Sequence, residues 1–188
     1  MKAKQAIDNI ESQIQLIDED IKAIRQALSD LEEQEQKNSG RVVHALDMFE
    51  ELQKEVTSDP ERYGSALPEI EKQIENIQSE FSQFVTLNSS GDPVEAAEIL
   101  DTAENHIVAL KQIVERVPEI VTALQSKLPD QLEDLESGYR KLLESGYHFT
   151  ETDIESRFQQ LHASLKNNMA NVSALELDNA IYENEQIQ

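Results

Sequence analysis

The sequence predicts an all-α protein made of long amphipathic helices. Gly and Pro are scarce, with five of each among 188 residues, so the chain has few places to turn. Aromatic residues make up 5% of the sequence, too few for a typical β-sandwich or barrel core, and the abundant Leu, Ile, Glu, Gln and Lys are typical of long helices. Apolar residues recur at alternating steps of three and four. We expect elongated antiparallel three-helix bundles that share long helices.

The first predicted helix spans about residues 3–37. Eight apolar residues follow one another at steps of three or four: Ile7, Ile10, Ile14, Ile17, Ile21, Ile24, Leu28 and Leu31. Their mean spacing of about 3.5 residues places them on one seam that can pack against partner helices. Lys37-Asn38-Ser39-Gly40 has the composition of a helix end. We therefore expect a break there, and a partner for the seam.

The second helical element is expected at about 41–57 and, after an interruption, 66–88. Its first part should bury Val43, Leu46, Phe49, Leu52 (or Gln53) and Val56. Pro60 lacks an N–H and restricts the residue before it, so Ser58-Asp59-Pro60 should end this part. The second part carries a heptad series of Leu67, Ile70, Ile74, Ile77, Phe81 and Phe84, and should end near Asn88-Ser89-Ser90-Gly91.

Asp92-Pro93 should open the next helix, with Asp as N-cap and Pro at the first helical position. Its seam runs along about 94–128: Leu100, Ala103, Ile107, Leu110, Val114, Val117, Val121, Leu124 and Leu128. An extra step of four then shifts the seam to Leu132, Leu135, Tyr139 and Leu142 in a helix of about 129–146. Because Pro118 and Pro129 interrupt this span, one long kinked helix and several shorter helices both remain open.

The last predicted helix spans about 151–188, with Ile154, Phe158, Leu161, Leu165, Met169 and Val172 on its inner face. It follows two copies of Glu-Ser-Gly-Tyr, at 136–139 and 144–147, of which the second should end a helix. The helical pattern is under way near both ends of the sequence, so we expect the chain to be part of a longer protein. The two expected domains are a three-helix bundle at 1–128 and a partial next repeat at 129–188.

The charge balance bears on partners. The chain has 38 acidic and 16 basic residues, a formal net charge of −22. Binding to nucleic acid or directly to an anionic membrane surface needs a basic patch, which the sequence does not supply. We interpret the acidic residues chiefly as solvated helix faces, with a dedicated basic partner as the alternative. No apolar run approaches the roughly 20 residues of a membrane helix.

Candidate chemical sites are few. The histidines are His44, His106, His148 and His162, and none lies at metal-ligand spacing from another. Adjacent carboxylates such as Glu32-Glu33, Glu50-Glu51 and Glu133-Asp134 are expected by chance in so acidic a chain. Tyr139 and Tyr147 suit a helix core better than a pocket, and with no cysteine the chain has no thiol nucleophile. We predict no catalytic, cofactor-binding or metal-binding residue, no cofactor and no enzymatic activity; partner-binding residues are not assigned.

Several interruptions of the heptads carry a family resemblance. They are Tyr63-Gly64 with Ala66, Gly91-Asp92 leading to Glu95-Ala96, and Leu128-Pro129 with Gln131-Leu132, followed by Gly138-Tyr139-Arg140 and Gly146-Tyr147. With these elements, residues of about 40–165 resemble the cytoplasmic region of the bacterial septation ring formation regulator EzrA. The resemblance implies spectrin-like three-helix repeats in a rod that is anchored by an N-terminal membrane helix outside these residues.

The resemblance also implies a function and a place in the cell. Such proteins regulate assembly of the tubulin-like FtsZ and contact other division proteins, at the cytoplasmic side of the membrane and at the septum. It leaves self-association through the helix ends open. Two other interpretations remain: an unrelated coiled-coil scaffold or tether, and an enzyme or ligand-binding bundle, which a large pocket with convergent polar groups would favour.

Overall fold

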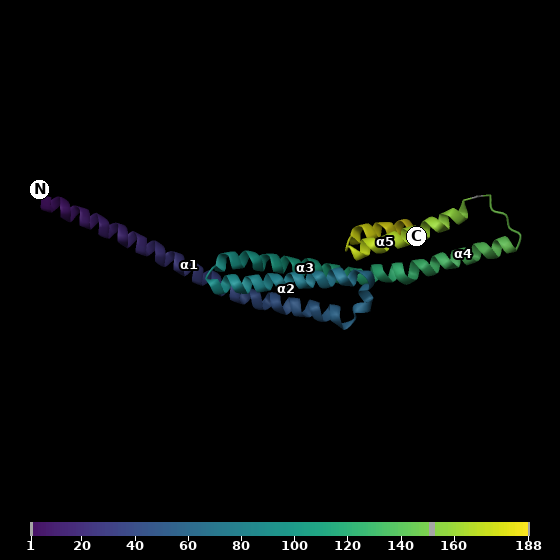
Figure 1. Ribbon diagram of the computed structural model, residues 1–188, viewed down its shortest axis with the longest axis horizontal. Helices are drawn as coiled ribbons and strands as arrows, with labels where there is room; N and C mark the ends of the chain where they lie inside the picture. Colours follow the sequence, from purple (N-terminus) through teal and green to yellow (C-terminus); the bar gives the residue numbers. More distant parts are fainter. Residues whose placement is uncertain (1, 151–152, 188) are drawn as a thin grey trace. The chain divides into compact units, whose positions relative to one another are not determined.

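The computed structural model describes residues 2–150 and 153–187, and its elements are helical throughout (Figure 1). In chain order they are α1 (Lys2–Ser58), η1 (Pro60–Ala66), α2 (Leu67–Ser90), α3 (Pro93–Thr122), η2 (Ala123–Lys127), α4 (Leu128–Glu144), α5 (Ile154–Ser173) and α6 (Leu177–Ile187). The helices pack against one another, which confirms the all-α class.

Two compact units divide the chain. The first combines residues up to Asp47 with Ser79–Glu104, and the second combines Met48–Gln78 with the residues from Asn105 onward. α1 and α2 each contribute to both units, as does α3. The core of the first unit is apolar apart from Asn38 and includes Ala45, Phe81, Phe84, Ala96, Leu100 and Ala103.

The expected break at 37–40 is absent, because α1 continues without interruption to Ser58. Asn38 is fully buried and hydrogen-bonded to another helix, and the hydroxyl of Ser39 donates to the carbonyl oxygen of Glu35 at 3.0 Å. Helix propensity is a weak preference that tertiary contacts override. The expected end at Ser58-Asp59-Pro60 is confirmed, and η1 follows it.

The inward face expected for 41–57 was wrong in part. Val43 and Leu46 are 59% and 39% exposed, whereas Ala45 is fully buried. The buried residues of this part continue the heptad series that runs from Ile7 to Leu31. Steps of seven from Leu31 lead to Asn38, Ala45 and Leu52, which are all buried.

The helix that begins at Pro93 resolves the open question about 94–146. Helical structure runs from Pro93 to Glu144, with one π-helical turn, η2, inside it. Asp92 caps its start as expected, accepting a hydrogen bond from the backbone N–H of Glu95 at 3.2 Å. Leu132 is buried, but Leu135 and Leu142, expected on the same seam, are 62% and 42% exposed.

The single helix expected at 151–188 is wrong: α5 ends at Ser173, and α6 turns back beside it (Figure 1). Leu175 adopts a positive φ of 59°, and the backbone N–H of Glu176 donates to the carbonyl oxygen of Asn171 at 2.9 Å. The hairpin buries Leu165 and Val172 together with Leu177 and Ala180. This burial offsets the strain of the turn. The expected helix start at 151–152 lies outside the described residues.

Candidate interaction surface

The most prominent surface feature is the aliphatic stripe on the N-terminal part of α1, which we call the α1 seam. Its eight members are between 37% and 60% exposed: Ile7, Ile10, Ile14, Ile17, Ile21, Ile24, Leu28 and Leu31. At about 1.5 Å per residue the seam is about 36 Å long. Single exposed apolar residues are ordinary, but a contiguous apolar patch of this length marks an interaction surface.

Many residues beside the α1 seam are polar, although Leu16 there is apolar and 60% exposed, and several of the polar ones pair within the helix. Lys22 and Lys37 form ion pairs with Asp18 and Glu33 at 2.7 Å, and the amide of Gln26 donates to Asp30 at 2.8 Å. Pairs four residues apart on an exposed helix each contribute only a few tenths of a kcal/mol. Covering an Ile or Leu side chain fully is worth roughly 1.5–3 kcal/mol. Apolar contact is therefore the main free-energy source that this surface offers a partner.

The seam ends where α1 enters the core of the first unit. Asn38, one step of seven beyond Leu31, donates from Nδ2 to the carbonyl oxygen of Pro93 at 2.7 Å and accepts from Gln34 Nε2 at 2.9 Å. A buried Asn in place of an aliphatic residue at such a position fixes the register of packed helices. The composition of residues 37–40 predicts a helix end at Asn38, whereas its heptad position is the signal for this buried role.

Arg41 adds a second, charged link in the same unit. Its guanidinium binds Glu104 at 2.7 Å and also Asp101, both on α3. Hydrogen bonding to Glu104 outweighs partial desolvation and raises the pKa of Arg41. The arginine is 35% exposed, so water screens the pairs and their main effect is to orient α1 against α3.

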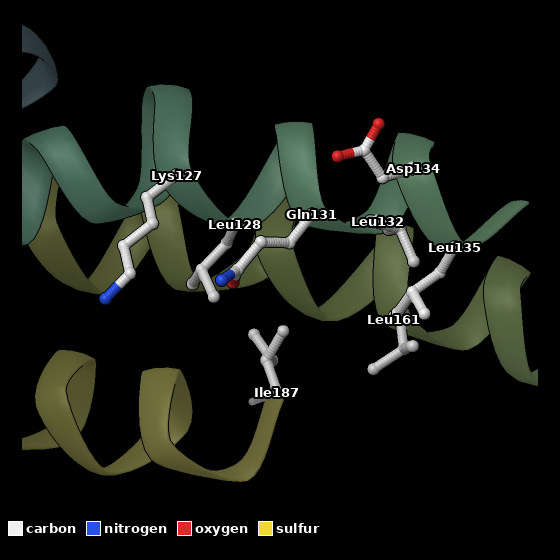
Figure 2. A pocket seen from close by; sticks show the side chains of 8 residues that line it. All are labelled: Lys127, Leu128, Gln131, Leu132, Asp134, Leu135, Leu161 and Ile187. Carbon is white, nitrogen blue, oxygen red and sulfur yellow. The ribbon is translucent and has the colours of Figure 1, made fainter. Parts of the chain in front are cut away.

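The second unit carries an open groove of about 530 Å³. Figure 2 shows Leu132 and Leu135 of α4, Leu161 of α5 and Ile187 of α6 lining one space, with Lys127 and Asp134 also at its wall. Leu135 faces this open groove and is 62% exposed. The leucines of the groove and Ile187, bordered by Lys127, Gln131 and Asp134, suit the face of a further amphipathic helix.

The candidate chemical residues do not converge. Nε2 of His162 lies 2.8 Å from Oε1 of Glu136, and no group of three or more His, Asp or Glu side chains in the described part of the chain could hold a metal ion. The adjacent carboxylates Glu32-Glu33, Glu50-Glu51 and Glu133-Asp134 are all exposed. Tyr139 packs against Phe149 and Phe158, with ring centroids 5.0 and 5.8 Å away, whereas Tyr147 is 64% exposed.

Comparisons with known proteins decide the family. The model of the family described as "Septation ring formation regulator, EzrA" matches residues 1–188. The chain belongs to the EzrA family. Septation ring formation regulators EzrA of Streptococcus sanguinis, Streptococcus gordonii and Streptococcus pneumoniae are 78%, 70% and 69% identical to it over all 188 residues.

Family membership confirms the resemblance and excludes an unrelated coiled coil. EzrA proteins are named as regulators of septation ring formation, so the family to which the chain belongs takes part in bacterial cell division. The chain spans about a third (33%) of the length of the curated relatives it matches. No solved structure matches it. Within the described residues, no helix combines the length and apolar character needed to cross a membrane.

Proposed function

We propose that this EzrA-family chain is part of a non-enzymatic scaffold that modulates FtsZ ring assembly and links division proteins. In the full-length protein it forms a segment of a cytoplasmic rod of spectrin-like units, held at the membrane by a helix outside these residues. The observation that carries the proposal is the α1 seam, a surface of eight aliphatic side chains on a helix of 57 residues.

Helix contacts supply the mechanism. The α1 seam offers an apolar stripe, and the groove beside Leu135 and Leu161 offers a second apolar surface. Both bind through helix faces, so the effect on ring assembly comes from occupying and positioning partners without a covalent step. Covering half of the seam is worth on the order of 5 kcal/mol before the costs of ordering the partners, enough for reversible contacts.

The charge of the chain shapes these contacts. A formal net charge of −22 opposes close approach of many copies and favours partners that bring positive charge. Contacts with a basic partner would weaken as salt rises, whereas contacts through the aliphatic seam would not. The salt dependence of a measured interaction therefore identifies which surface is used.

Sedimentation of FtsZ polymers tests the proposal. Purified FtsZ is polymerised with GTP alone, with the full cytoplasmic region, or with the 188-residue chain, and the pelleted fraction is measured. We expect the full region to lower the pelleted fraction, and the chain to do so less because it holds about a third of its relatives' length. An unchanged pellet with the full region at all ratios would contradict the proposal.

A further inference from the structure

The connection between α1 and α2 is packed tightly in the second unit. Residues Pro60–Ala66 form η1, in which Tyr63 and Ala66 are fully buried. Gly64 has φ 50° and ψ −126°, a backbone conformation that residues other than glycine rarely adopt. Solvent-exposed connections seldom bury a tyrosine completely. This connection is therefore part of the core.

One side of η1 lies against the long helix that begins at Pro93. A Cβ atom on Gly64 would lie 2.9 Å from Cγ1 of Val121 and 2.7 Å from Nε2 of Gln125. Gln125 can swing its amide away, but Val121 is branched and 5% exposed, so it has little room to move. Glycine at position 64 is what allows the backbone to approach the helix this closely.

The long helix departs from α-helical geometry at this contact. Gln125 lies in η2, and the buried residues around it follow one another at two steps of four: Leu124, Leu128 and Leu132. In an α-helix each step of four turns the side chain about 40° further around the axis. A π-helical turn holds more residues and offsets this drift. η2 thus keeps the three leucines facing inward where the sequence shifts its register.

η1 also lies against α5. The two elements pack together, and the hydroxyl of Ser65 donates to the carbonyl oxygen of Met169 at 3.5 Å. α5 also packs against η2 and α4. η1 therefore contacts both the long helix and the α5–α6 hairpin.

We propose that η1, Val121, Gln125 and Met169 form a rigid joint that sets the direction of the α5–α6 hairpin, with Gly64 as its positioning residue. A side chain at position 64 pushes η1 away from the helix and redirects the hairpin, while the helices themselves persist. In a scaffold, the direction of this hairpin decides where bound partners are held. The joint itself is independent of whether FtsZ is one of them.

Distance measurements between two spin labels test the joint. The chain has no cysteine, so Asn76→Cys on α2 and Gln160→Cys on α5, both at exposed positions in the second unit, can be labelled selectively. Double electron–electron resonance should give one narrow distance distribution for this pair. In the Gly64→Ala background the distribution should shift or broaden, while far-UV circular dichroism shows unchanged helix content.

Two further variants distinguish the steric effect of a side chain at position 64 from the effect of backbone strain at a glycine with positive φ. Gly91 also has a positive φ, 85°, but a Cβ there would meet nothing within 4 Å, so Gly91→Ala should leave the distribution unchanged. Adding Val121→Ala to Gly64→Ala removes the closest rigid neighbour and should narrow the distribution only in part, because the positive φ at position 64 still strains an alanine. A broad distribution in the labelled parent would overturn the proposal even if Gly64→Ala failed to fold. So would equal distributions for Gly64→Ala and the parent, or a shift caused by Gly91→Ala.

Discussion

The side-chain amide of Asn38 on α1 donates a hydrogen bond to the carbonyl oxygen of Pro93, the first residue of α3, over 2.7 Å. Asn38 is fully buried, and its own oxygen accepts from Gln34. The exposed α1 seam stops one heptad before this residue. The bond therefore marks the boundary between the part of α1 that packs within the first unit and the part that presents the seam.

Replacing Asn38 should destabilise the first unit. Asn38→Ala removes the bond and leaves the carbonyl oxygen of Pro93 without its donor, at a cost of about 1–3 kcal/mol. The free energy of unfolding, from urea titration followed by circular dichroism, measures this. Ser39→Ala is the matched control on the next, exposed residue and should change it by less than about 0.5 kcal/mol. Equal effects of the two variants would mean that the Asn38 contact does not stabilise the unit.

The ion pairs of Arg41 should contribute little stability. Because the guanidinium is 35% exposed, Arg41→Gln should lower the free energy of unfolding by at most about 1 kcal/mol. The loss should shrink in high salt, which screens the parent's pairs. Lys22→Gln, which removes a more exposed pair within α1, serves as the control. A loss for Arg41→Gln above 2 kcal/mol that persists in salt would contradict this prediction.

Tyr63 leads to a less intuitive prediction. Its ring is fully buried, and its hydroxyl has no hydrogen-bond partner among the described residues. Tyr63→Phe removes an unsatisfied polar atom and keeps the ring, so it should leave the chain equally stable or stabilise it by up to about 1 kcal/mol. Thermal unfolding at neutral pH measures the difference. A destabilisation of more than 1 kcal/mol would show that the hydroxyl is bonded, for example to a buried water.

The same residue predicts a pH dependence. Burial raises the pKa of Tyr63, so the folded state retains the phenol proton where the unfolded chain loses it. The unfolded phenol ionises near pH 10, and stability is lost as the pH rises beyond that value. Between pH 9 and 11 the parent should lose more stability than Tyr63→Phe. Parallel losses in the two proteins would place the tyrosine in contact with solvent.

Exposed and buried isoleucines should respond differently to the same substitution. Ile14 in the seam is 60% exposed, whereas Ile77 in the core is 1% exposed. Ile77→Ala should cost 2–5 kcal/mol, since it leaves a cavity. Ile14→Ala should cost less than about 0.5 kcal/mol in the 188-residue chain, because its side chain contacts mainly water. A large cost for Ile14→Ala would show that the chain covers its own seam.

The sequence revealed the helices more reliably than their ends. Heptad steps found the buried faces of α2 and α3, because apolar periodicity reports directly on packing. The prediction was wrong at Asn38. The segment 37–40 has the composition of a helix end, and the residue that Asn38 bonds to, Pro93 on α3, is distant in the sequence. The α5–α6 turn was missed for a related reason. It contains no glycine or proline, and Leu175 adopts its positive φ because packing of the hairpin requires the turn.

The interaction surface was only half predictable. The α1 seam was visible as eight regularly spaced residues. The partner helix that the sequence predicts for it is not found among the described residues, where all eight side chains are exposed. The groove beside Leu135 was not visible, because it depends on α6 turning back beside α5, which the sequence did not predict. The π-helical turn η2, which packs against α5, left one trace in the sequence, the extra step of four after Leu128.

The central claim is that the chain acts through the α1 seam on FtsZ assembly, and one comparison tests it most directly. The full cytoplasmic region is prepared as the parent, as Ile14→Ser with Ile21→Ser in the seam, and as Val43→Ser with Val108→Ser, two exposed positions outside it. Each is added to polymerising FtsZ, and the pelleted fraction is measured. We predict that the parent and the Val43/Val108 variant lower the pellet equally and that the seam variant loses this effect. A seam variant as active as the parent would contradict the claim.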